Sequence, residues 1–313
     1  MPSPIARVAA LLGGRLTDGS FAAGWALVRA MPEPAAIRLF DAGADLAARR
    51  GGKGIDRLRS NLTRVAPDAD LDRLTRDALR SYARYWREVF RLPVTPTATL
   101  IAGMTPVHEE RLRAVVASPR GVILALPHSG NWDQAGAWLG ATGVPFATVA
   151  ERLKPESLYD RFVAFRESLG MEVLPLTGGA RPPFDILADR LAAGGAVCLM
   201  ADRDLTPRGV DVSFFGATAR MPAGPAALAL RTGAALLPTH LCFRGTGWQV
   251  TFYEEIPPTN VATMTQAMAD AFADGIARSP ADWHMLQRLW LDDLADDDPR
   301  KARQPGPATA DPT

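Results

Sequence analysis

The strongest constraint on the fold is a regular alternation of apolar runs and helical segments between residues 121 and 202. Four runs typical of buried strands are separated by segments with helical periodicity: GVILALP, PFATVAE, MEVLPL and AVCLMAD. Strands joined by helices of about 10–15 residues predict a sheet with parallel crossovers. Two later runs, ALLPTHLCF and GWQVTFYEEI, lie close enough in the chain to pair as a hairpin. We therefore expect a mixed sheet.

The chain has 313 residues, of which 47% are hydrophobic, and this is enough for one large α/β domain with a substantial core. We expect N-terminal amphipathic membrane-docking helices over residues 1–66, an α/β core over 67–291 and a disordered polar tail over 292–313. The predicted fold class is α/β, with a single domain whose mixed, partly parallel sheet is flanked by helices.

Positive charge is concentrated near the N-terminus. Residues 1–91 hold 16 Arg or Lys against 10 Asp or Glu, although the whole chain has a net charge of only +1. A basic amphipathic segment favours anionic lipid by roughly 1 kcal/mol per residue near the surface; a solvated Arg-rich face explains the charge alone equally well. No apolar run reaches the ~20 residues of a membrane span. We expect a peripheral protein at the cytoplasmic face of the cell (inner) membrane, and no nucleic-acid partner.

The polar sequence HSGNWD follows the first strand of the alternating region. Asn131 can cap the next helix and Asp133 then lies in its first turn, so His128 and Asp133 are expected at the carboxyl end of the strand, where open α/β sheets bind ligands. A neutral imidazole suits a general base near pH 7, and a carboxylate can fix its tautomer. The alternative is a loop histidine beside a carboxylate that only stabilises the helix dipole.

The spacing of the remaining histidines, cysteines and glycines does not favour a metal or a nucleotide cofactor. Neither H-x3-H nor H-E-x-x-H occurs, and Gly178-Gly179 is not part of a phosphate-binding loop. His240 lies in an apolar run and is expected to be a buried structural residue. Cys198 and Cys242 lie in similar runs, which predicts buried free thiols in a reducing compartment.

HSGNWD, with its H-x4-D spacing, resembles the signature of the glycerolipid acyltransferase superfamily, and specifically its branch of lipid A biosynthesis acyltransferases and bacterial phosphatidylinositol mannoside acyltransferases. The resemblance covers most of the chain, through YARYWREVFRLP, AERLKPE, ADRDL, MPAGPAALALRTGAALLP and DWHMLQRLW. ADRDL, RMPAGPA and DWHMLQ look closer to the mannoside branch. The resemblance implies transfer of a fatty acyl chain, palmitoyl, from the co-substrate acyl-CoA to a mannose hydroxyl, without a covalent enzyme intermediate and without a cofactor.

The resemblance also implies roles for particular residues. His128 would deprotonate the acceptor hydroxyl, and Asp133 and Asp202 both remain candidates to orient it. An acceptor site is implied for a carboxylate, an arginine and a second histidine: Glu151, Arg166 and His284. Phosphates of coenzyme A are implied to meet three basic residues: Arg203, Arg208 and Arg220. For each of these Glu and Arg residues the alternative is a solvated surface charge. For His284 the alternative is simple packing near Trp283.

Three other functions stay open at this point. The first is the sister activity, acylation of a lipid A precursor. The second is a non-catalytic lipid-binding protein with the same fold, and the third is a thioester hydrolase that uses the same histidine to activate water. The expected partners are acyl-CoA, a glycolipid acceptor and an anionic membrane surface, while the oligomeric state is left open.

Overall fold

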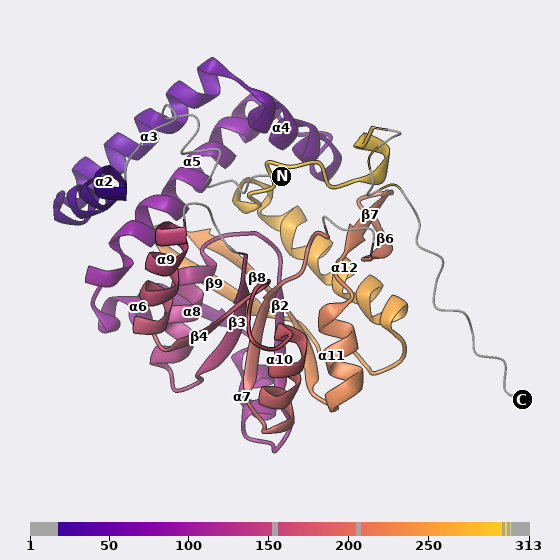
Figure 1. The fold of residues 1–313 in the computed structure, drawn as a ribbon. Coiled ribbons are helices and arrows are strands. Elements are labelled where there is room, and N and C mark those ends of the chain that lie inside the picture. Colours follow the sequence, from indigo (N-terminus) through magenta and orange to yellow (C-terminus); the bar gives the residue numbers. More distant parts are fainter. Residues whose placement is uncertain (1–17, 152–155, 205–207, 296–297, 299–300, 302–313) are drawn as a thin grey trace, which may run out of the picture.

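The computed structural model describes residues 18–151, 156–204, 208–295, 298 and 301 (Figure 1). Its α-helices are α2 (Asp18–Ala30), α3 (Glu33–Arg50), α4 (Lys53–Val65), α5 (Leu71–Arg91), α6 (Thr97–Gly103), α7 (Glu109–Val116), α8 (Trp132–Ala141), α9 (Glu156–Ser168), α10 (Pro183–Ala192), α11 (Gly224–Thr232) and α12 (Val261–Arg278). Short 3-10 turns are η1 (Leu92–Val94), η2 (Pro280–Asp282) and η3 (Leu291–Asp293).

The strands are β1 (Met104–Val107), β2 (Val122–Leu126), β3 (Phe146–Ala150), β4 (Met171–Pro175), β5 (Ala196–Met200), β6 (Val210–Phe214), β7 (Ala217–Met221), β8 (Ala235–Arg244) and β9 (Gly247–Phe252). Seven of them form one sheet in the order β1-β9-β8-β2-β5-β3-β4. β8 and β9 pair antiparallel, and the other neighbours in this sheet run parallel. The predicted hairpin and mixed α/β sheet are confirmed. β6 and β7 form a separate antiparallel pair.

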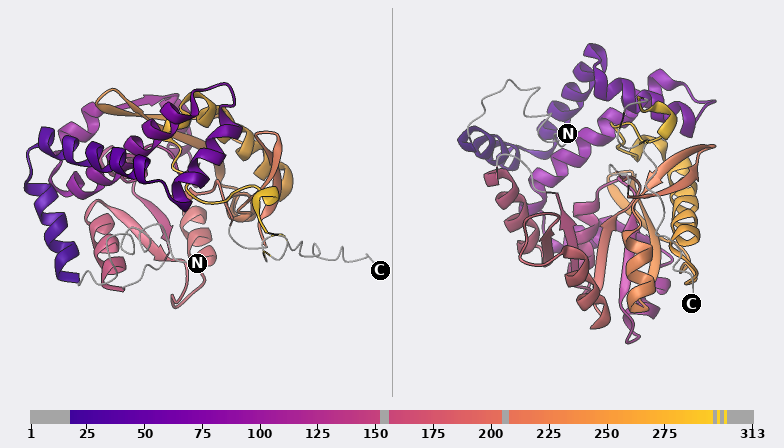
Figure 2. Two further views of the ribbon diagram at one scale, coloured as in Figure 1. Left: turned by 90° about the horizontal axis from the view of Figure 1, so that it is seen from above. Right: turned by 45° about the vertical axis from the view of Figure 1, so that its right-hand side comes forward.

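Helices cover both faces of the seven-stranded sheet (Figures 1 and 2). Successive side chains of a strand point to opposite faces, and β2 shows this clearly. Ile123 and Ala125 belong to the core that includes side chains of α10, α11 and α12. Leu124 and Leu126 belong to the second core, which includes side chains of α5, α8 and α9. Burial on both faces explains why the strands read as continuous apolar runs in the sequence.

Two helix boundaries near the site have clear local causes. Asp70 caps α5, where its side chain accepts hydrogen bonds from the backbone N–H groups of Asp72 and Arg73. α11 ends at Gly233, which has the left-handed φ of 71° that glycine adopts without a Cβ penalty.

The N-terminal helices α2 to α5 lie together at one end of the sheet (Figure 1). α4 packs on α5 through a small core that includes Leu58, Leu62 and Ala78. Trp25 joins α2 to the body, because its indole N–H donates to the carbonyl oxygen of Phe90 at 2.7 Å and its ring centroid lies 5.4 Å from that of Phe162. None of the described helices combines the length and apolarity that a bilayer-crossing segment needs.

The predicted disordered tail lies largely outside the described residues. Its first part is described: η3 begins at Leu291, and Leu294 is buried.

Candidate active site

The loop between β2 and α8 carries His128 and is held in one conformation by its neighbours. Asn131 caps α8, its side-chain oxygen accepting the N–H of Gln134 at 3.0 Å, as the sequence predicts. Gly130 has a φ of +57°, and a Cβ there would lie 2.8 Å from the carbonyl carbon of Leu241. Only glycine therefore fits between the histidine and the helix start.

The His128 imidazole is paired with Asp202, which follows β5. The distance from His128 Nδ1 to Asp202 Oδ1 is 2.5 Å, and the backbone N–H of His128 donates to Oδ2 at 2.9 Å. Trp283 Nε1 donates to the same Oδ2 at 3.0 Å. Because an ionised carboxylate only accepts, Nδ1 carries the proton and Nε2 presents its lone pair. Asp202 is fully buried, whereas the His128 side chain is 22% exposed.

The pKa of Asp202 shows how its surroundings favour the ionised form. Burial by itself would raise this pKa, but the charge of His128 and the donated hydrogen bonds bring it below its usual value. An ionised Asp202 is therefore available to fix the tautomer of His128 and to stabilise the imidazolium form.

The segment 282–284 clamps the backbone of the histidine loop from the other side. The N–H of Gly130 donates to the carbonyl oxygen of Asp282 at 2.9 Å, and the N–H of His284 donates to that of His128 at 2.8 Å. Ser129 and Trp283 form an isolated antiparallel bridge between these contacts. The loop is thus fixed by both backbone and side-chain hydrogen bonds.

Asp133 has different partners and does not contact His128 by a hydrogen bond. Arg166 of α9 donates to both of its oxygens, at 2.7 and 3.2 Å, and the hydroxyl of Tyr85 donates at 2.9 Å. Burial by itself would lower the pKa of Arg166, but Asp133 raises this pKa above its usual value. Burial and the nearby Asp133 raise the pKa of Tyr85. Of the two carboxylates that the sequence left open, Asp202 is the one beside the imidazole.

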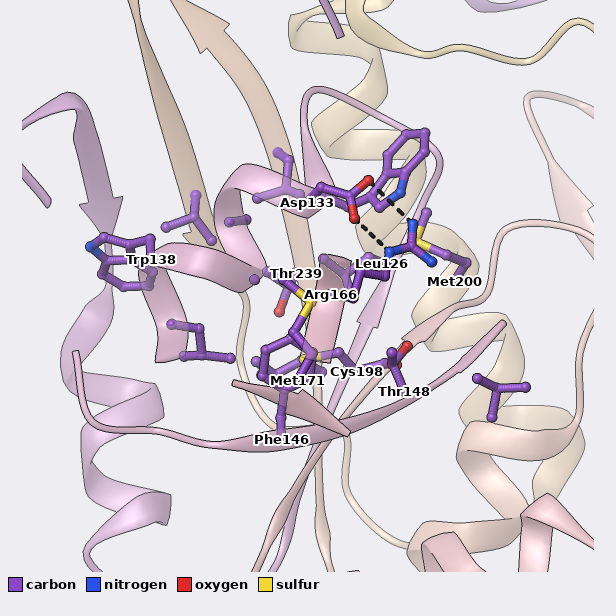
Figure 3. Close-up of a pocket in the computed structure, with 18 of the residues that line it drawn as sticks. Leu126, Asp133, Trp138, Phe146, Thr148, Arg166, Met171, Cys198, Met200 and Thr239 are labelled. Carbon is purple, nitrogen blue, oxygen red and sulfur yellow. Dashed lines mark hydrogen bonds and ion pairs between the residues drawn. The ribbon is translucent and has the colours of Figure 1, made fainter. Parts of the chain in front are cut away.

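A largely apolar pocket begins beside the Asp133–Arg166 pair (Figure 3). Side chains of α8 and of strands β2, β3, β4, β5, β8 and β9 line it, among them Leu124, Trp138, Phe146, Met171, Met200, Leu241 and Phe252. Trp132 also belongs to the lining, and its ring centroid lies 5.6 Å from that of His128. The pocket therefore reaches within one side chain of the imidazole and can hold an apolar group there.

The three predicted acceptor residues do not share one environment. Glu151 is exposed just after β3. Arg166 already forms the bidentate pair with Asp133, so its charge is balanced inside the protein. His284 is 7% exposed, its Nε2 lies 3.0 Å from the Ser81 hydroxyl oxygen, and burial lowers its pKa to about 3. His284 Nδ1 has no hydrogen-bond partner among the described residues.

The three arginines predicted to meet coenzyme A phosphates also differ. Arg203 is half-buried next to Asp202, and burial lowers its pKa against the opposing effects of Asp202 and Glu151. Arg208 is exposed. Arg220 is 3% exposed, and its Nε donates to Asp211 at 2.6 Å. Arg220 is thus buried and paired with Asp211 within the β6–β7 pair.

The remaining candidate groups are a metal set, His240 and the two cysteines, of which Cys198 lines the pocket of Figure 3. Within the described residues, no three His, Cys, Asp or Glu side chains converge as a metal-binding group. His240 of β8 is 4% exposed where its ring packs against Gly275 of α12, and burial lowers its pKa to about 4. Both cysteines are free thiols, and burial raises the pKa of each.

Four side chains that support the site were not singled out from the sequence. Trp283 binds Asp202 and Tyr85 binds Asp133, while Ser81 contacts His284 and Glu88 contacts Asn131. Ser81, Tyr85 and Glu88 have the i, i+4, i+7 spacing of one helix face. The sequence did carry a signal for these four residues: polar residues within the otherwise apolar stripe of α5, and the tryptophan of DWHMLQ.

A histidine of an H-x4-D sequence that is oriented by a buried carboxylate at the carboxyl end of a parallel strand, next to an apolar pocket, fits the class of acyltransferases. The family model described as bacterial lipid A biosynthesis acyltransferase matches residues 16–292, and the chain belongs to this family.

Two relatives are similar over nearly their whole length. A protein of Mycolicibacterium smegmatis named phosphatidylinositol mannoside acyltransferase is 57% identical over 297 residues, which cover 93% of this chain and 96% of the relative. A Mycobacterium tuberculosis (strain H37Rv) protein of the same name is 55% identical over 287 residues, 90% of each chain.

Proposed function

We propose that the protein transfers a palmitoyl chain from acyl-CoA to a mannose hydroxyl of phosphatidylinositol mannoside, at the cytoplasmic face of the cell membrane. The names of both relatives support this acceptor. The observation that carries the chemistry is the buried Asp202 bound to Nδ1 of a partly exposed His128, because this pairing leaves Nε2 to accept a proton.

In the proposed reaction, Nε2 of His128 takes the proton of the mannose hydroxyl as its oxygen attacks the thioester carbonyl. The tetrahedral intermediate then expels the coenzyme A thiolate, and the imidazolium returns the proton to the sulfur. Asp202 stabilises the imidazolium between these steps. The first N–H groups of α8, those of Trp132 and Asp133, have no partner within their own helix and are suited to receive the oxyanion.

The pocket of Figure 3 is the proposed site of the acyl chain, because its lining is mainly apolar and its near end lies beside His128. The methionines Met171 and Met200 in this lining are flexible and can adapt to an alkyl chain. The Asp133–Arg166 pair lies at the edge of the pocket, where it keeps Arg166 in place and charge-balanced.

For the acceptor and donor headgroups we propose two residues that follow the carboxyl ends of β3 and β5. Glu151 is exposed and can accept hydrogen bonds from sugar hydroxyls, and Arg203 can meet a phosphate. Arg203 and Asp202 are adjacent in the chain, so an anion bound by this arginine lies close to the base. A lipid A precursor carries several phosphates and would favour a denser cationic site, which supports the mannoside acceptor.

The test is a transfer assay with purified protein, palmitoyl-CoA and each acceptor in turn, read by mass spectrometry. We expect acylated phosphatidylinositol mannoside, no product from the lipid A precursor, and a loss of about 10²-fold or more in kcat for His128→Ala. Product from the lipid A precursor alone would assign the sister activity. Release of coenzyme A without any acceptor would indicate a hydrolase, and no turnover at all would indicate a lipid-binding protein.

A further inference from the structure

Glu88 is a buried carboxylate of α5 that the proposed reaction does not use, and its two oxygens face different parts of the protein. Glu88 is 8% exposed. Its Oε1 accepts from Arg84 Nε at 2.6 Å. Its Oε2 accepts from Asn131 Nδ2 at 2.8 Å and from Trp248 Nε1 at 2.7 Å.

Asn131 is the residue through which Glu88 reaches the site. The oxygen of the Asn131 side chain caps α8, while its amide nitrogen donates to Glu88. One amide group therefore connects the start of α8 to α5. His128 lies three residues before Asn131 in the chain. Gly130 lies between these two residues, and because it has no side chain the loop can pack against Leu241.

The same face of α5 touches the site at two further points. Tyr85 donates to Asp133, and Ser81 lies 3.0 Å from Nε2 of His284, whose backbone N–H holds the carbonyl of His128. The residues at both of these contacts have other interaction partners nearby. The side-chain amide of Asn131, in contrast, donates to Glu88, so this link connects α5 directly to the helix start that follows the histidine loop.

We infer that Glu88 is a positioning residue for the acyl transfer: it fixes Asn131, and through it the loop that presents His128 Nε2. The inference rests on the proposed function. It predicts a change in the rate of the chemical step without a matching change in the binding of acyl-CoA, because Glu88 does not line the pocket.

The hydrogen bond between Asn131 and Glu88 can be removed by a substitution at either residue. Asn131→Ser keeps a side-chain oxygen that caps a helix but cannot reach Glu88, and Glu88→Met removes both carboxylate oxygens. We expect each variant to lose about 10-fold to 10²-fold in kcat with KM for palmitoyl-CoA little changed, since a shift of about 1 Å in a reacting group has an effect of this size. The double variant should lose no more than one single variant, because both cut one link.

Two further variants separate positioning from general stability. Trp248→Phe removes the other donor to the same oxygen and should lower the melting temperature while kcat stays at the wild-type value. Glu88→Gln can still offer one oxygen to Asn131, so it should restore most of the kcat lost in Glu88→Met. If Glu88→Met does not fold, Asn131→Ser and Glu88→Gln still test the link.

A readout without substrate comes from NMR of ¹⁵N-labelled histidine side chains, since the chain has only four histidines. In Asn131→Ser and Glu88→Met we expect the His128 signals to shift or broaden, while His240 and His108 signals stay in place as internal references. If these signals change but the wild-type protein acylates nothing, the proposed function is wrong and the positioning role stands. Unchanged His128 signals and unchanged kcat in Asn131→Ser, or losses that multiply in the double variant, would overturn the inference.

Discussion

Asp202 and Asp133 are both buried carboxylates near one loop, yet their partners give them different tasks. Asp202 accepts hydrogen bonds from the imidazole and the backbone N–H of His128 and from an indole N–H, so its charge faces His128. Asp133 accepts hydrogen bonds from Arg166 and Tyr85, so its charge balances a half-buried cation. The residue that completes the H-x4-D spacing therefore supports the pocket wall, and a residue 74 positions from His128 orients it.

The two carboxylates should respond differently to the same substitution. Asp202→Asn removes the acceptor that fixes the Nδ1–H tautomer and stabilises the imidazolium, so we expect kcat to fall by roughly 10²- to 10⁴-fold. Asp133→Asn leaves Arg166 without its anion and should lower the free energy of unfolding by roughly 3 kcal/mol, the low end for a broken buried ion pair because Arg166 is partly exposed. Kinetics and urea unfolding of both variants check this.

A result in which Asp133→Asn abolishes turnover in fully folded protein, while Asp202→Asn leaves kcat intact, would contradict this division of tasks.

At the residue scale, the sequence located His128 at the end of its strand but not the carboxylate that lies beside it. The H-x4-D spacing and the strand before it were enough to place His128 and the cap Asn131. The choice between Asp133 and Asp202 depends on how β5 lies beside β2, which is a contact between distant segments that local patterns do not encode. The buried state of Arg220 and the pairing of Arg166 were missed for the same reason.

At the scale of elements, the strands and helices with clear periodicity were predictable and the short ones were not. The four parallel strands, the β8–β9 hairpin and α12 follow from continuous apolar runs or a 3.6-residue period. β1 has four residues and includes Pro106, and it depends on β9 for its pairing. β6 and β7 turn through Phe215 and Gly216, with φ of 49° and 75°, and phenylalanine is an uncommon residue at the first of these left-handed positions.

The N-terminal elements combine exposed charge with exposed apolar side chains. Leu39 and Leu46 of α3 are 52% and 45% exposed. Basic residues follow at the end of α3 and along α4: Arg49, Arg50, Lys53, Arg57 and Arg59. Trp25 is engaged in packing, and the side chain of Phe21 lies outside the described part of the chain, so the apolar contribution to docking is expected from the leucines.

We expect replacement of these five basic residues by Gln to weaken binding to anionic vesicles, by roughly 1 kcal/mol for each residue near the surface. The matched control replaces five exposed arginines elsewhere and changes the net charge equally: Arg181, Arg190, Arg231, Arg244 and Arg278. Vesicle sedimentation at low and moderate salt measures both. Equal weakening in the two variants would show that binding follows net charge and not this surface.

At the scale of the whole molecule, stability should fall in mild acid because two histidines are buried in the neutral form. Burial lowers the pKa of His240 to about 4 and that of His284 to about 3, compared with about 6.5 in an unfolded chain. The unfolded state therefore binds more protons below pH 6.5. The stabilising effect is complete above this pH and is lost as the pH falls toward the folded-state values.

Each of these histidines should contribute a slope of up to about 1.4 kcal/mol per pH unit below pH 6.5. Urea unfolding at pH 7.5, 6 and 5 measures the slope, and His240→Leu should reduce it by the share of one proton. Arg278 and Asp274 face His240 and act in opposite directions, with burial the larger influence. An identical slope in His240→Leu and the wild type would show that His240 does not titrate on unfolding.

The contact of Trp283 with Asp202 also has a consequence for biosynthesis. These residues are 81 positions apart, and His284 holds the backbone of His128 from a still greater distance along the chain. During translation the histidine leaves the ribosome long before residues 282–284 do. Until that segment has emerged, the nascent chain lacks the hydrogen bonds from Trp283 to Asp202 and from His284 to His128, and a message that stops before it yields a protein without them.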